Sequence, residues 1–254
     1  MEENKFIIYF NPNINIEVRE KDHKNEQLVY KVINAFREEA RIIKKQNFCL
    51  YFGYRKNELG FLLVKNTPEY NSFPERHDIP DYNHFDCIIY VSLEVRESNN
   101  EIFKAFTISH ELQHLLQEIS LSNILKLKST ILFMYYILKR KNPHELPREI
   151  DAQRKSKIIT TRIYGEEEIA SFIPQQISTA KDSDKKLYWE HIKSINTKSP
   201  YFLEKEISLY WGKYKQEIKN EIEKIRKSSE GITGEEKNFL EIYSKLEKNN
   251  DINI

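Results

Sequence analysis

The segment His110-Glu111-Leu112-Gln113-His114 constrains this chain more than any other part of its sequence. It lies in a run whose apolar residues recur at helical spacing, which predicts a buried helix over about residues 99–119. Two histidines four positions apart share one face of a helix, so both imidazoles can reach the same point. A buried helix tolerates two histidines and a glutamate only when these groups are paired or bound to a metal ion. The segment therefore predicts a metal centre on a buried helix.

The order of residues within this segment also predicts a division of roles. His110 and His114 offer neutral nitrogen ligands, while Glu111 lies about a quarter-turn away and faces a water on the metal without binding the metal itself. Zinc suits such a site, because it accepts nitrogen and carboxylate ligands and can keep one position open for water. The ion lowers the pKa of that water, and the glutamate takes its proton. We therefore expect Zn²⁺ as the cofactor and Glu111 as the general base.

A third ligand is expected from a helix further along the chain. Pro147 suits the first turn of a helix predicted over 147–164, and Glu149 points out of that turn. Two alternatives remain open: Asp151, two positions later, and the cluster Glu166-Glu167-Glu168. Carboxylate oxygens bind zinc alongside histidine nitrogens, so each of the three is chemically acceptable.

These segments resemble those of the ImmA/IrrE group of bacterial zinc metallopeptidases, with a looser likeness to other gluzincins. In that group a pattern like E-x-[ED]-A on a later helix completes the HExxH site, and Glu149-Ile150-Asp151-Ala152 matches it. The resemblance covers roughly residues 25–165. It implies that His110, His114 and Glu149 bind zinc and that Glu111 is the catalytic base.

The resemblance also implies the fold and the domain organisation. We expect an α+β, zincin-like metallopeptidase domain over residues 1–165, with a small antiparallel sheet, followed by a helical extension over residues 166–254. The strand predicted over 87–95 matches the family's edge strand, which can pair with an extended peptide substrate.

Other histidines and tyrosines are considered for a role in the site. His144 is expected to be a solvated loop histidine, with donation to a transition-state oxyanion as the alternative. His77 and His84 lie in a proline-rich loop without metal-ligand spacing and are expected to have no role. Three tyrosines on predicted helices could also donate to an oxyanion, although aromatic residues on helices are more often core: Tyr135, Tyr136 and Tyr164.

The pattern along the chain separates a mixed first part from a helical remainder. Apolar residues at helical spacing predict a helix over 24–45, and the proline-containing segment 66–86 is expected to be a loop. Apolar runs predict strands over 5–10, 48–54, 59–65 and 87–95, with a tight polar turn over 55–58 joining the second and third. Later patterns predict helices over 99–119, 122–140, 147–164, 166–177, 181–195, 201–229 and 234–248.

An apolar stripe runs along the otherwise charged residues 201–225. It predicts either a helix packed on the catalytic domain or a docking surface for a partner, with Trp211 and Tyr214 as anchors. The residues alone do not decide between these two interpretations.

Composition excludes several classes of protein. Lysine plus arginine number 40 against 39 for aspartate plus glutamate, so the net charge is +1. Proteins that mainly neutralise nucleic-acid phosphates have a strong basic excess, so we expect no direct nucleic-acid binding. No signal peptide is visible, and the longest apolar run, 131–138, is far shorter than the roughly 20 residues that cross a bilayer. We therefore expect a cytoplasmic protein with no membrane contact and with reduced thiols at Cys49 and Cys87.

The residues and the resemblance together predict a zinc-dependent endopeptidase of narrow specificity. Its expected substrate is a protein partner inside a bacterial cell, such as a helix-turn-helix transcriptional repressor or an antitoxin. The alternative is a regulatory module that keeps its metal and holds a partner without cutting it. A metal-dependent hydrolase of non-peptide substrates is a third, weaker possibility, because the predicted edge strand favours an extended chain as substrate.

Overall fold

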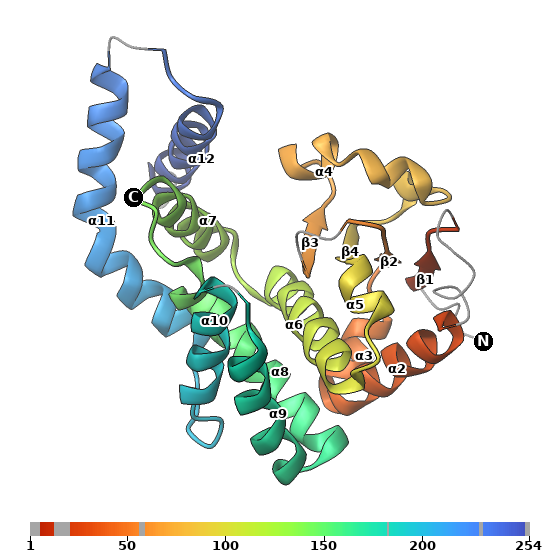
Figure 1. The fold of residues 1–254 in the computed structure, drawn as a ribbon. Helices are drawn as coiled ribbons and strands as arrows, with labels where there is room; N and C mark the ends of the chain where they lie inside the picture. The colour runs from red at the N-terminus through yellow and green to blue at the C-terminus, as the bar shows by residue number, and fades with distance from the viewer. Residues whose placement is uncertain (1–5, 13–20, 56–58, 182, 229–230, 252–254) are drawn as a thin grey trace. The chain divides into compact units, whose positions relative to one another are not determined.

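A computed structural model describes residues 6–12, 21–55, 59–181, 183–228 and 231–251 (Figure 1). The described chain has an α+β fold, with many helices and one small sheet. Its packing divides the chain into two compact units, one formed by Met1–Leu116 with Ala152–Thr197 and the other by Gln117–Asp151 with Lys198–Ile254. The predicted division at residue 165 into a catalytic domain and an extension stays a prediction.

The first unit contains a four-stranded mixed sheet in the order β1-β2-β4-β3 (Figure 1). Strands β1, β2 and β4 are parallel, and β3 runs antiparallel to β4. Every residue of β2 and β4 is buried, which explains why these two strands are continuous apolar runs rather than alternating ones. The strands are β1 (Phe6–Phe10), β2 (Phe48–Phe52), β3 (Gly60–Val64) and β4 (Cys87–Val91).

Three expectations about this sheet are wrong. The sheet is mixed rather than antiparallel, and β2 and β3 do not form a hairpin, because β4 lies between them. For the same reason the strand that precedes the active helix is not at an edge; the edge strands are β1 and β3. The predicted turn fell on residues 55–58, of which 56–58 lie outside the described residues. Local patterns predict strands, but their order depends on contacts between residues distant in the chain.

Two predicted elements are shorter than expected for local reasons. The strand predicted over 87–95 ends at Val91, since the Ser92 hydroxyl accepts a hydrogen bond from the Val95 amide and begins helix α5 (Leu93–Glu97). The helix predicted over 24–45 is two helices, α2 (Asp22–Ala35) and α3 (Glu38–Lys44). The break falls at Arg37, whose φ of 59° is incompatible with a continuous helix.

The two faces of the sheet are covered differently. Alternate residues such as Leu50 and Ile89 pack on one face against helices α2, α3, α6 (Glu101–Ser120) and α8 (Pro147–Tyr164). On the other face, Cys49, Tyr51 and Tyr90 pack against the segment between β3 and β4, whereas the buried Cys87 packs on the first face. That segment was predicted as a loop but carries short helical turns, α4 (Pro68–Ser72), η1 (Pro74–Asp78) and η2 (Tyr82–His84).

Each helix predicted after residue 99 is present in the described chain. In the first unit, α9 (Glu166–Thr179) and α10 (Ser183–Ser194) pack around Trp189 and Phe106. In the second unit, Trp211 and Tyr214 are 8% and 9% exposed within the core, so they are packing residues and not anchors on an open surface. The elements of the second unit are α7 (Asn123–Leu138), η3 (Pro143–Glu145), α11 (Leu203–Lys227) and α12 (Gly234–Asp251).

Candidate metal centre

Helix α6 carries the two histidines and the glutamate of the sequence motif. The helix begins where the Asn100 side chain accepts a hydrogen bond from the Phe103 amide at 3.0 Å. Ala105, Ile108 and Leu112 then face the apolar core of the first unit and hold the helix against the sheet. The fold therefore fixes the orientation of the motif through packing of the opposite helix face.

The two histidine rings lie against one another on this helix. Their Nε2 atoms are 3.0 Å apart and the ring planes are 82° apart, and His110 is 8% exposed. Two nitrogens bound to one tetrahedral zinc ion, each about 2.0–2.1 Å from it, lie roughly 3.4 Å from each other. The spacing of the pair is thus close to that of two ligands of one ion.

Glu149 completes a group with the two histidines. Each of the three side chains offers one ligand atom, and these atoms all lie within 4.8 Å of one another. In the part of the chain that the structure describes, this is the one group of three or more histidine, cysteine, aspartate or glutamate side chains that could hold a metal ion. Two imidazoles and a carboxylate are a donor set that zinc accepts, so the residues present fit the ion.

Glu149 lies in the first turn of α8, as its position after Pro147 predicted. Its Oε2 atom is 3.8 Å from Nδ1 of His144, which lies in η3 and is about two-fifths exposed. Burial lowers the pKa of the neighbouring Arg148, while the carboxylates of Glu118, Glu149 and Asp151 raise it.

The alternative ligands are engaged elsewhere. Asp151 accepts a hydrogen bond at 2.8 Å from the Gln117 side chain, which also donates to the Arg148 carbonyl. The cluster Glu166-Glu167-Glu168 is exposed in the first turn of α9, where negative charge is favourable at a helix N-terminus. Neither belongs to the group of ligand atoms described above. The assignment of Glu149 as the third ligand, rather than one of these, stays a prediction.

The candidate oxyanion donors on helices occupy other positions. Tyr164 follows Glu149 by fifteen residues on one helix, which places it about 22 Å along the helix axis. Tyr135 and Tyr136 are buried in the core of the second unit, where the Tyr135 hydroxyl donates to Glu217. His144, in contrast, lies beside Glu149, one of the proposed ligands.

One feature next to the motif is absent from the sequence predictions. Gly60, the first residue of β3, lies directly beside the Glu111 side chain. Glu111 itself is 4% exposed. A glycine inside a strand pattern often marks a close approach of another group, and this signal was present in the sequence.

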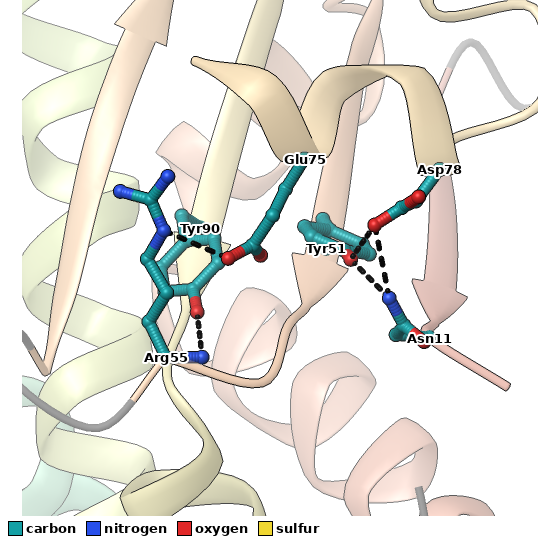
Figure 2. A network of polar contacts seen from close by, with 6 residues as sticks. All are labelled: Asn11, Tyr51, Arg55, Glu75, Asp78 and Tyr90. Carbon is teal, nitrogen blue, oxygen red and sulfur yellow. Dashed lines mark hydrogen bonds and ion pairs between the residues drawn. The ribbon is translucent and has the colours of Figure 1, made fainter. Parts of the chain in front are cut away.

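A second polar cluster, also missed, lies at the carboxyl ends of the parallel strands (Figure 2). Glu75 accepts a hydrogen bond from Nε of Arg55 at 2.7 Å, and the Tyr90 hydroxyl accepts one from the Arg55 amide. Burial raises the pKa of Glu75, and Arg55 opposes that rise. A similar set links Asn11 to the hydroxyl of Tyr51 and the carboxylate of Asp78. The cluster fastens the segment between β3 and β4 to the sheet.

No helix within the described residues has the length and apolar character needed to cross a membrane. Comparisons of the chain with models of protein families, with curated proteins and with solved structures gave no match.

Proposed function

We propose that the chain is a zinc-dependent endopeptidase that cleaves a specific intracellular protein partner. The observation that carries this proposal is the His110–His114 pair, with Nε2 atoms 3.0 Å apart on a helix that also presents Glu111. His110, His114 and Glu149 would hold the ion. When bound, zinc supplies a Lewis acid that polarises a carbonyl and lowers the pKa of a coordinated water.

Side chains of the protein would carry out the proton transfers and stabilise the developing charge. The Glu111 carboxylate would accept, at one Oε atom, a proton from the water that attacks the peptide carbonyl carbon, and would return it to the amine that leaves as the C–N bond breaks. Glu111 is buried, so its carboxylate is held away from bulk water. His144, which lies beside Glu149, is the residue that we propose as a hydrogen-bond donor to the oxygen on which negative charge develops.

The position of β3 supports an extended peptide as substrate. β3 pairs on one side with β4 and is one of the two edge strands of the described sheet, so its other side offers backbone groups to an added strand. A substrate that pairs with this edge passes next to Glu111, because Gly60 of the same strand lies against that side chain. By the family resemblance, the partner is a transcriptional repressor or an antitoxin.

The substitution Glu111→Gln tests the proposal. It removes the general base and leaves the three ligands intact, so zinc content should stay at one ion per chain while cleavage falls by about 10²- to 10⁴-fold. The measurement compares new protein N-termini in cells that produce the native chain or the Glu111→Gln variant. New termini that require Glu111 would support the endopeptidase.

Two other outcomes would contradict it. Zinc binding with identical cellular termini for both proteins would favour the alternative, a module that holds a partner without cutting it. A native chain that binds no metal after purification and zinc reconstitution would remove the metal centre altogether.

A further inference from the structure

Gly60 occupies a position where no other residue fits without moving its neighbours. A Cβ atom at this position would lie 2.9 Å from Cγ and 2.9 Å from Oε1 of Glu111, and 3.0 Å from the carbonyl oxygen of Tyr90. These separations are several tenths of an ångström shorter than a favourable contact between carbon and another heavy atom. Space, rather than backbone freedom, is what this glycine provides, because its φ is not among the positive values in the described chain.

The two neighbours differ in their ability to move. The Tyr90 carbonyl belongs to β4, whose residues pair with β2 on one side and with β3 on the other, so it is fixed by the sheet. Glu111 is attached to α6, which is fixed by its packing, but its side chain can change rotamer. A methyl group at position 60 would therefore displace the Glu111 carboxylate first.

We propose that Gly60 is a positioning residue for Glu111. Its missing side chain lets the edge strand approach α6 closely enough to confine the carboxylate to one orientation, with its Cγ and Oε1 against the strand backbone. The catalytic meaning of this contact rests on the proposed function, whereas the contact itself does not. Because His110 and His114 are separate side chains, displacement of Glu111 removes the base and spares the metal ligands.

A double-mutant cycle on the metal-free protein tests the contact without any substrate. Gly60→Ala should lower the melting temperature by about 3–8 °C, the usual effect of overpacking in a chain of this size. In a Glu111→Ala background, where Cγ and the carboxylate are gone, the same change should lower it by less than about 2 °C. Gly212→Ala is the matched control, since a Cβ there meets nothing within 4 Å, and it should cause no decrease.

Measurements on the zinc-loaded protein test the positioning role. Gly60→Ala should retain its zinc in competition with a chelator, and should lower kcat about 100-fold on a quenched-fluorescence peptide that the native chain cleaves, with KM changed less than about threefold. The double variant Gly60→Ala/Glu111→Asp, whose carboxylate is one methylene shorter, should recover about tenfold of that loss.

The outcomes separate this inference from the proposed function. An equal decrease in melting temperature with either residue at position 111 overturns the contact, whatever the enzyme does. A clear coupling together with native kcat in Gly60→Ala overturns the positioning role alone. A native chain that cleaves no peptide or protein overturns the proposed function and the catalytic meaning of Gly60, while the melting temperatures still decide whether Gly60 makes room for Glu111.

Discussion

The Nε2 atoms of His110 and His114 lie 3.0 Å apart on one face of α6. This spacing is near that of two ligands of one tetrahedral ion, and it is set before any metal arrives, because the other face of the helix is packed in the core. Binding to a prearranged pair stabilises the folded chain, since the unfolded chain has no such site.

Zinc is expected to stabilise the folded protein through the two histidines. At a free concentration of 100 times the dissociation constant, it should raise the free energy of unfolding by about 2.7 kcal/mol. The double substitution His110→Ala/His114→Ala should abolish this gain, whereas His77→Ala, on the segment between β3 and β4, should keep it. Thermal unfolding with and without zinc measures the difference, and an undiminished gain in the double variant would refute the site.

The identity of the third ligand predicts a difference between two substitutions on α8. Glu149→Ala should weaken zinc binding about tenfold or more, because it removes an oxygen ligand. Asp151→Asn should have a smaller effect, since its partner Gln117 can still hydrogen-bond to an amide. Competition with a chromogenic chelator measures both affinities, and the reverse order would identify Asp151 as the ligand.

Arg96 is expected to be the largest single polar contribution to the first unit. Its guanidinium is fully buried, pairs with both oxygens of Asp22 at 2.9 and 2.6 Å, and donates to the Asn11 and Phe52 carbonyls. Arg96→Ala should reduce the free energy of unfolding by about 3–5 kcal/mol, because it leaves these acceptors without their donor. Urea unfolding measures the loss. The exposed Lys185, which pairs with Glu94, is the control, and Lys185→Ala should change stability by less than about 1 kcal/mol.

Glu75 predicts a specific dependence of stability on pH. Burial raises its pKa in the folded protein above the ordinary value of 4.5, so the folded chain binds this proton more readily than the unfolded chain. The resulting stabilisation is complete below about pH 4.5 and is lost as the pH rises through the folded pKa. The glutamine in Glu75→Gln cannot ionise. The melting temperature of this variant should therefore rise relative to that of the native chain as the pH increases from 4.5 to 8.

An exposed carboxyl on the same segment serves as the control for this titration. Glu69 lies in α4 at the surface, so the melting temperature of Glu69→Gln should not rise in this way relative to that of the native chain. A constant difference between Glu75→Gln and the native chain across the pH range would mean that the Arg55 ion pair offsets the burial of Glu75 fully.

The sequence by itself determined the later helices and the pairing of the two motif histidines. Helical spacing of apolar residues predicts α6 to α12, since amphipathic periodicity is a local property of the chain. The four-residue spacing of His110 and His114 likewise places the two imidazoles together, because a helix brings positions i and i+4 to one face. The break of a predicted helix at Arg37 escaped this reasoning, as no proline or glycine marks it.

Only the tertiary structure decided what surrounds the motif. The order β1-β2-β4-β3 depends on pairing between residues far apart in the chain, so the antiparallel sheet, the hairpin and the edge position of the strand over 87–95 were predicted wrongly. The same pairing brings Gly60 against Glu111. It also brings Glu75, on the segment between β3 and β4, to Arg55. Local periodicity contains no information on which strand lies beside which, because the free energy of pairing arises from packing of the whole sheet.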